Sequence, residues 1–379
     1  MNKGLMQVAI KLLANDKGKF FTLIIGISFA VFLMMQMTSV FSGLMYRTSA
    51  TIYNIGAKMW VMDPSVNIQM DNIPMPDYIL DAVRSINGVK YAVPLFSGAG
   101  LVKLDDGRYQ SVNIIGLDDA TLYGRPSILN GNIYSLYNND AYIITKDSEF
   151  PKFNNPTIGT TFEVNDNRGV VVGIAKALVG GLFGTPTLYT TFIRATKDLP
   201  TSRFTISYIL VEPKNDNAIS TIKNQVKSLG YIALTQKEFI QKNKNYYLYK
   251  TGFGTNIFIM TLVSFIVGLS IAGQTFYTFV LENIEEFGAL KAIGAKKSEL
   301  IKMIFLQSTV VGFIGYGLGV LLASILIALA KIRLPEYASL ITIQNLVVSF
   351  IMVILIILFS SYFGIKKVIH IDPFEIFRG

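Results

Sequence analysis

The sequence predicts an α-helical membrane protein with four transmembrane helices and a large α+β extracytoplasmic domain. Of its 379 residues, 51% are hydrophobic and only 16% are charged, whereas charged residues make up about 25% of soluble domains. Mean hydropathy is +0.45. Four apolar runs are each long enough to cross a bilayer as a helix. The segment 47–250, between the first two runs, contains no such run and is long enough to form a core of its own.

The N-terminal region predicts a helix at the membrane surface that leads into the first span. Apolar residues in 1–19 recur at helical spacing among lysines, which is typical of an amphipathic helix, here a cytoplasmic elbow. The pattern consists of Leu5, Val8, Ala9, Leu12 and Leu13, with Lys3, Lys11, Lys17 and Lys19 around them. Residues 20–46 predict the first transmembrane helix. This run is longer than the apolar core of a cleavable signal peptide, which has about 7–15 residues.

The two ends of the extracytoplasmic segment 47–250 have the same β-α-β pattern. Alternating and helical periodicities predict a strand at 58–62, a helix at 77–86 and a hairpin of strands 91–104 and 109–115. Near the other end they predict a strand at 205–212, a helix at 218–229 and a strand at 231–234.

Between these two halves lies a predicted β-rich insertion at 117–203, with short strands at 142–144, 161–164 and 170–174. It is rich in Gly, Asn, Pro, Thr and Tyr. Its apolar glycine loop at 177–184 could contact a partner or a lipophilic ligand, but a plain turn between strands is the favoured interpretation.

The C-terminal part predicts three further transmembrane helices at 251–281, 301–330 and 343–365, an outer loop at 331–342 and a cytoplasmic tail at 366–379. Small residues at four-residue spacing allow helices to approach closely, so they predict helix packing. They are Ser264, Gly268 and Ala272 in the second span, and Gly315, Gly319 and Ala323 in the third. Four spans place both termini on one side, and a modest excess of Lys and Arg there favours the cytoplasm.

Several classes of chemistry are excluded or disfavoured. There is no cysteine, so disulfides, thiolate metal sites and cysteine nucleophiles are excluded. The single histidine, His370, disfavours a Ser-His-Asp triad. The sequence contains no metal-binding motif and no dense basic face that would bind nucleic acid. It also has no charged residue at the centre of a span. The nearest match to a phosphate-binding loop, from Gly288 to Ser298, has the wrong glycine spacing. We therefore expect no catalytic residue, no metal and no cofactor in this chain.

The connector 282–300 between the second and third spans predicts a short helix. Glu282, Glu285 and Glu286 lie toward its start and Lys291, Lys296 and Lys297 toward its end, a polarity that complements the helix dipole. Phe287, Leu290 and Ile293 predict an apolar edge, Gly294 a sharp exit and Ser298 the start of the next helix. From the residues alone, a solvated connector and a docking helix are equally favoured.

The motif Glu286-x-Gly288-x-Leu290-Lys291-Ala292-x-Gly294-Ala295 resembles the signature of the FtsX-type permeases, which include MacB, the lipoprotein-releasing permeases and DevC. The order of elbow, span, large domain and three spans is similar as well. The tail, with Pro373, Glu375 and Arg378, resembles the family's Pro-x-Glu-x-x-Arg ending. The N-terminal layout and the strand at 172–174 resemble the DevC-like branch most.

The resemblance implies a homodimeric permease in a bacterial inner membrane, bound to a separate ABC ATPase that carries ATP and Mg²⁺. It implies that the connector docks on this ATPase as a coupling helix. The implied contact residues are Glu286, Phe287, Gly288, Leu290, Lys291, Ala292, Gly294 and Ala295. It also implies that the outer domain is a MacB-like periplasmic core domain, with porter-like β-α-β lobes, to which ATP-driven motion is transmitted.

The DevC-like branch further implies export of a lipophilic or amphipathic substrate through a periplasmic adaptor and an outer-membrane channel. Two alternatives stay open from the sequence. One is an FtsX-like signalling permease that regulates a cell-wall hydrolase. The other is a lipoprotein-releasing permease.

Overall fold

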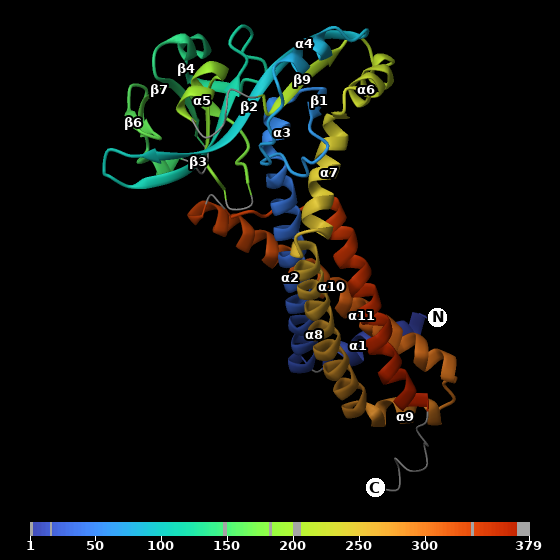
Figure 1. Ribbon diagram of the computed structural model, residues 1–379. Coiled ribbons are helices and arrows are strands. Elements are labelled where there is room, and N and C mark those ends of the chain that lie inside the picture. Colours follow the sequence, from blue (N-terminus) through green and yellow to red (C-terminus); the bar gives the residue numbers. More distant parts are fainter. Residues whose placement is uncertain are drawn as a thin grey trace. The chain divides into compact units, whose positions relative to one another are not determined.

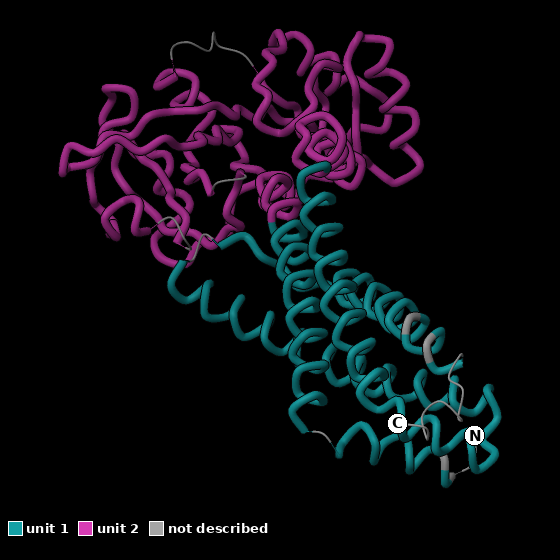
Figure 2. Tube along the Cα trace, turned by 90° about the horizontal axis from the view of Figure 1, so that it is seen from below, with its two compact units in different colours: residues 1–43, 255–379 teal, residues 44–254 magenta. Residues whose placement is uncertain are grey.

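The computed structural model describes residues 3–15, 17–146, 150–181, 184–199, 206–334 and 337–369. The chain forms two compact units, shown in Figure 2: residues 1–43 with 255–379 make unit 1, and residues 44–254 make unit 2. The predicted tail motif with Pro373, and His370, lie outside the described residues.

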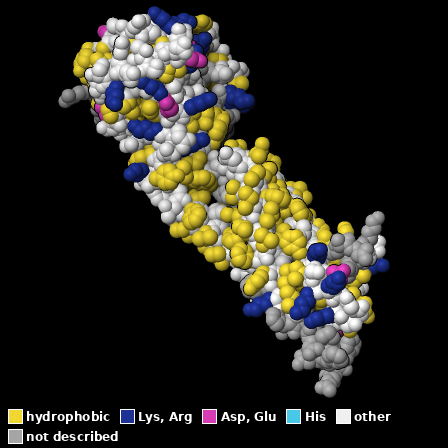
Figure 3. Space-filling view, turned by 90° about the vertical axis from the view of Figure 1, so that its right-hand side faces the viewer, with side chains coloured by type: hydrophobic (Ala, Val, Ile, Leu, Met, Phe, Trp, Pro, Cys, Tyr) yellow, Lys and Arg dark blue, Asp and Glu magenta, His cyan; other side chains and the backbone are white. Residues whose placement is uncertain are grey.

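Unit 1 is built of helices. They are α1 (Lys3–Asn15), α2 (Lys17–Thr48, which continues into unit 2), α8 (Phe253–Glu282), α9 (Ile284–Ala292), α10 (Lys297–Arg333) and α11 (Ile343–Ile369). Among the described residues, four of these helices, α2, α8, α10 and α11, are long and apolar enough to cross a membrane. The predicted four spans are therefore confirmed. Figure 3 shows a face of this unit on which hydrophobic side chains form an extended surface, with Lys and Arg gathered at one end.

The small residues of α8 and α10 lie against α2. A Cβ atom added to Gly268 of α8 would overlap the Cβ of Ala30 in α2. One added to Gly319 of α10 would lie 2.6 Å from the carbonyl oxygen of Ser28. The other four residues of the small-residue pattern are buried as well: Ser264 and Ala272 in α8, and Gly315 and Ala323 in α10. All six residues from the small-residue pattern are thus inside the helix bundle, where they permit close approach of backbones.

The described residues of unit 2 form one sheet of ten strands. They are β1 (Met59–Met62), β2 (Val89–Lys103), β3 (Tyr109–Leu117), β4 (Ser127–Gly131), β5 (Ala141–Thr145), β6 (Thr161–Val164), β7 (Asn167–Lys176), β8 (Thr187–Thr191), β9 (Tyr208–Pro213) and β10 (Ile232–Thr235). Nine of them follow the order β10-β1-β9-β2-β3-β8-β5-β7-β4, and β6 pairs with β2 and β7. The mixed α/β character predicted for the outer domain is confirmed.

The helices of unit 2 are mostly short. They are α3 (Ala50–Ile55), α4 (Tyr78–Arg84), α5 (Phe192–Asp198), α6 (Ala218–Ser228) and α7 (Gln236–Tyr249), with 3₁₀ turns η1 (Ile133–Tyr137) and η2 (Phe150–Phe153). The two β-α-β halves, β1-α4-β2 and β9-α6-β10, interleave, because β1 pairs antiparallel with both β9 and β10 (Figure 1).

Successive side chains of β1 point to opposite faces of the sheet, so the interleaved halves have a hydrophobic core on each face. Met59 and Val61 pack with Val83 of α4 and Ile222 of α6 on one face. On the other face, Trp60 packs with Tyr208 of β9 and Phe239 of α7, at ring-centroid distances of 5.5 and 5.4 Å. In this part of the sheet, α4 and α6 therefore cover one face and α7 covers the other.

The insertion extends the same sheet. Its strand β8 pairs parallel with β3, with Ile115 opposite Tyr189, and β5 pairs parallel with β7. The strands expected at 142–144, 161–164 and 170–174 are present as β5, β6 and β7. The glycine loop turns from β7 to β8 through a bridge between Gly180 and Thr185, in agreement with the plain turn. Residues 182 and 183 of this loop lie outside the described residues.

Candidate functional site

The candidate site is α9, the short helix between the spans α8 and α10. Its first turn carries Glu285 and Glu286, where carboxylates complement the helix dipole. Asn283 precedes it and is buried, with its side-chain amide donating to the carbonyl of Phe279 at 2.7 Å. Glu282, expected at the start of this helix, is instead the last residue of α8. Its carboxylate lies 2.8 Å from the ammonium of Lys19 at the start of α2.

The C-terminal end of α9 is a Schellman motif. Gly294 has φ +100°, a conformation that L side chains rarely adopt. The N–H of Gly294 donates to the carbonyl of Lys291 at 3.1 Å, and the N–H of Ala295 donates to that of Leu290 at 3.0 Å. These two bonds satisfy carbonyls that would otherwise lack a partner at the helix end. The sharp exit expected at Gly294 is confirmed.

The next helix begins earlier than predicted. Ser298 was expected at its start, but α10 begins one residue earlier, at Lys297, and Lys296 occupies the N-cap position. The carboxylate of Glu299 accepts the N–H of Lys296 at 2.9 Å. Glu299 therefore gives the N-cap amide a hydrogen-bond partner, so a hydroxyl side chain at the N-cap is not needed.

The side chains of α9 divide between a buried and an exposed face. Phe287 is fully buried in the core of unit 1 and Leu290 packs against that core, whereas Ile293 is 82% exposed. The prediction that Ile293 continues their apolar edge was therefore wrong. At about 100° per residue, a position six residues on lies about 120° away from the first, outside a narrow helix face. Position i+7 would have been needed to keep the edge.

The eight residues inferred from the family motif occupy both faces of this segment. Phe287 and Gly288 are buried, Leu290, Lys291 and Ala295 are half-buried, and Glu286, Ala292 and Gly294 are exposed. The exposed face also contains Glu285, Ala289 and Ile293. Ile293 is the main residue that the sequence analysis placed on the wrong face. Its spacing of six residues from Phe287 was the signal that could have predicted its exposure.

Several contacts bind α9 to the other helices at its end of unit 1, where Figure 1 places α1 and the label N. The ammonium of Lys291 donates to the carbonyl of Ile369 in α11 at 3.4 Å. Nearby, the side-chain amide of Gln307 in α10 donates to the carbonyl of Ala9 in α1 at 2.9 Å. Phe287, Ala9 and Val368 of α11 belong to one buried cluster. Phe287 of α9 therefore packs in the same core as residues of α1, α10 and α11.

The described residues around α9 present an exposed surface of mixed apolar and charged side chains. Among the described residues, no group of three or more His, Cys, Asp or Glu side chains could hold a metal ion. Within this segment, the carboxylate of Glu282 pairs with Lys19, that of Glu299 accepts the N–H of Lys296, and the ammonium of Lys291 donates to the carbonyl of Ile369. The side chains of Glu285, Glu286, Lys296 and Lys297 are exposed. The surface is thus apolar at Ile293 and Ala289, with acidic residues on one side and lysines on the other.

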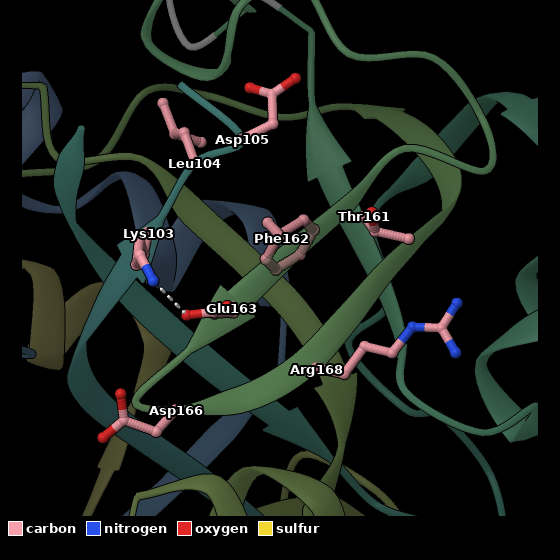
Figure 4. Close-up of a pocket in the computed structure, with 8 residues that line it drawn as sticks. All are labelled: Lys103, Leu104, Asp105, Thr161, Phe162, Glu163, Asp166 and Arg168. Atoms are coloured by element: carbon pink, nitrogen blue, oxygen red, sulfur yellow. Dashed lines mark hydrogen bonds and ion pairs between the residues drawn. The ribbon is translucent and has the colours of Figure 1, made fainter. Parts of the chain in front are cut away.

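Unit 2 has a separate polar recess at the tips of two hairpins, shown in Figure 4, with a volume of about 430 Å³. The ammonium of Lys103 lies 3.0 Å from the carboxylate of Glu163 across it. In the adjoining loop, hydrogen bonds from Asn154 and Arg108 lower the pKa of Asp106 to about 2. The recess therefore combines acidic and basic side chains, and Lys103 and Glu163 form an ion pair within it.

Two family models match the chain. The MacB-like periplasmic core domain matches residues 20–229, and the FtsX-like permease C-terminal region matches residues 257–373. An uncharacterized ABC transporter permease of Mycobacterium tuberculosis is 24% identical over 360 residues, covering 92% of this chain and 93% of that protein. A Staphylococcus haemolyticus protein named as a hemin transport system permease, HrtB, is 30% identical over 124 residues, covering 33% of this chain and 34% of that protein.

Two solved structures are similar to part of the chain. The periplasmic region of MacB from Actinobacillus actinomycetemcomitans covers 51% of this chain and 96% of its own, with 15% identity and a TM-score of 0.38. The extracellular domain of the transporter YknZ from Gram-positive bacteria covers 47% of this chain and 98% of its own, with 13% identity and a TM-score of 0.37.

Proposed function

The chain belongs to the MacB-like periplasmic core domain family, and we propose that it transmits ATP-driven motion from a separate ATPase to its outer domain. With its FtsX-like region it is an ABC transporter permease of the FtsX/MacB type, which confirms the family resemblance inferred from the sequence. Permeases of this class are generally non-catalytic membrane subunits. In this proposal ATP and Mg²⁺ bind to the ATPase, and the cargo is a lipophilic or amphipathic molecule for export.

The observation that carries the proposal is the exposed face of α9. Ile293 is 82% exposed, and it lies in a segment that is held rigidly by the Schellman motif and by the burial of Phe287. A large apolar side chain presented from a rigid helix suits a groove of a partner protein, because little conformational entropy is lost when it docks. We assign this groove to the ATPase.

Motion received at α9 has a physical path inside each unit. In unit 1, the contacts of Lys291 and Phe287 join α9 to α10 and α11. In unit 2, the side-chain amide of Asn243 in α7 donates to the carbonyl of Thr48 at 2.9 Å and to the hydroxyl of Ser49 at 3.1 Å. Asn243 therefore ties the last residue of α2 to the helix that precedes α8.

The remaining parts of the proposal concern the assembly. We place both termini and α9 in the cytoplasm and unit 2 outside an inner membrane, with the permease as a homodimer. This orientation follows the excess of Lys and Arg on the side of the termini. A periplasmic adaptor and an outer-membrane channel, implied by the DevC-like features, complete the exporter in this proposal.

The docking role is tested by purifying the permease with the ATPase that accompanies it. Replacing Ile293 with Glu adds an unpaired charge at the centre of the contact, so we expect at least tenfold less ATPase to co-purify. The matched control is Ile343→Glu, because Ile343 is 80% exposed at the start of α11, beyond the other end of α10. Equal recovery of the ATPase with the Ile293 variant and the wild type would remove α9 as the docking helix.

A further inference from the structure

A groove of about 470 Å³ lies along α7 in unit 2, on the stretch of chain that leads into α8. Its lining consists of Asn67, Glu238, Gln241, Lys242, Asn245, Tyr246, Tyr249 and Lys250. Two ammonium groups, three side-chain amides and two phenols thus converge on one recess. Amide and hydroxyl donors with a pair of cations form a set of groups that binds a phosphate ester.

The carboxylate of Glu238 does not oppose an anion here. Both of its oxygens lie 2.6 Å from the ammonium of Lys223, and Oε2 also accepts the N–H of Thr235, the N-cap residue of α7. The charges of Lys242 and Lys250 are the ones left to face the groove. Lys242 is half-buried and its ammonium donates to the carbonyl of Pro64 at 3.4 Å.

Chain length places one end of this groove at the membrane surface. Lys250 is three residues before Phe253, the first residue of the span α8, so the two Cα atoms are at most about 11 Å apart. The polar headgroup layer on each side of a bilayer is about 5–8 Å thick. Tyr249 is 78% exposed beside Lys250, as expected of an aromatic residue at headgroup level.

From the charge, the donors and the position together, we propose that the α7 groove binds the headgroup of an anionic phospholipid of the surrounding membrane. The phosphate lies against Lys242 and Lys250. The amide of Gln241 donates to Oδ1 of Asn245 at 2.8 Å, and the side-chain NH₂ of Asn245 binds the polar substituent of the headgroup. Burial lowers the pKa of Lys242, and an anion against its ammonium offsets that effect. The site does not depend on the transport role proposed above.

The test is lipid retention by the full-length chain, measured by native mass spectrometry after extraction from vesicles of equal phosphatidylglycerol and phosphatidylcholine. We expect the double variant Lys242→Gln, Lys250→Gln to retain at least fivefold less phosphatidylglycerol, with phosphatidylcholine unchanged. The matched control is Lys237→Gln, Lys244→Gln, which removes the same amount of charge from α7 without touching the groove lining. Added salt should weaken the wild-type retention, because the phosphate is at the surface.

Three outcomes would overturn the proposal. The first is equal loss of phosphatidylglycerol from the groove variant and the control, which would reduce the effect to net charge. The second is full displacement of the lipid by glycerol phosphate at millimolar concentration, which would make the groove a site for free phosphate esters. The third is a change in oligomeric state of the groove variant without loss of lipid, which would assign the groove to a second copy of the chain.

Discussion

The N–H of Ala295 donates to the carbonyl of Leu290 at 3.0 Å, across a turn in which Gly294 has φ +100°. This bond closes α9 and fixes the direction in which the chain leaves it for α10. A flexible connector at this point would absorb a displacement of α9. In the proposed coupling role, the closed Schellman motif is what passes a displacement of α9 on to the first turn of α10.

Replacing Gly294 with Ala should weaken this turn. A Cβ atom there would have nothing within 4 Å, so the expected cost of about 1–2 kcal/mol comes from the left-handed backbone alone. We expect a lower thermal unfolding temperature in detergent and less stimulation of the ATPase by the permease. Both are measured on the full-length chain.

The control for this substitution is Gly273→Ala in α8. Its Cβ atom would also have nothing within 4 Å, but Gly273 lies inside a helix. There Ala is favoured over Gly by about 0.5–1 kcal/mol. If both variants lost stability equally, the positive φ at Gly294 would not be the cause.

Replacing Gly268 with Leu should separate α8 from α2. Even a Cβ atom at this position would overlap that of Ala30, and overpacking of this kind costs about 1–3 kcal/mol. We expect lower thermal stability and lower yield of folded protein in detergent. Gly317→Leu is the control, because a Cβ at Gly317 would have nothing within 4 Å and the residue lies on the exposed side of α10. Unchanged stability of the Gly268 variant would show that the helices can move apart without cost.

Replacing Asn243 with Leu should destabilise unit 2. The buried amide donates to Thr48 and Ser49, and its oxygen accepts the N–H of Gln69 at 3.2 Å. Each buried group left without a partner costs about 1–3 kcal/mol. We expect faster hydrogen exchange at the end of α2 and in α7. Lys237→Leu, at an exposed position of the same helix outside the groove, should leave the exchange rates unchanged. A similar response of both variants would argue that Asn243 does not hold α7 to the end of α2.

The buried Asp198 should make the stability of unit 2 depend on pH. Desolvation raises its pKa above the ordinary 3.8, and its carboxylate accepts the hydroxyl of Tyr142 at 2.5 Å. Because the folded state binds this proton more tightly than the unfolded state does, proton binding at Asp198 adds to the free energy of unfolding. That contribution is fully present below the ordinary pKa. It is lost as the pH rises through the raised value.

Asp198→Asn keeps an acceptor for Tyr142 and removes the titration. We therefore expect the stability of the variant relative to the wild type to increase as the pH is raised above 4. Denaturant unfolding of both proteins across this range measures the difference. A constant difference at every pH would exclude Asp198 as the titrating group.

The spans and the lobe elements were predictable because each is encoded locally. Apolar length alone identifies α8 and α10, and alternation with a turn at Asp105, Asp106 and Gly107 identifies the β2–β3 hairpin. The position of β8 beside β3 was not predictable, since a parallel pairing of 113–117 with 187–191 depends on contacts distant in sequence. Strand β4 was missed because four of its five residues are exposed and show no alternation.

Helix α7 was missed although the sequence contains its signal. Thr235 and Glu238 form a capping box, and Phe239, Asn243 and Tyr247 recur at four-residue spacing. The polar Asn in the middle of that stripe concealed it, because a buried amide is recognised only when its partners are known. At the candidate site, the family motif was enough to predict the position of α9. That Ile293 is exposed follows only from counting about 100° per residue along the helix.

The central claim is that α9 faces the cytoplasm and docks on an ATPase. The chain has no cysteine, so single cysteines can be placed at Ile293 and at Ile343, which are 82% and 80% exposed beyond opposite ends of α10. A membrane-impermeant thiol reagent is added to intact cells, and then to inverted membranes with and without the ATPase. We predict that Ile343→Cys is labelled in cells, and that Ile293→Cys is labelled only in inverted membranes and is protected by the ATPase. Labelling of Ile293→Cys in intact cells, or undiminished labelling with the ATPase bound, would contradict the account.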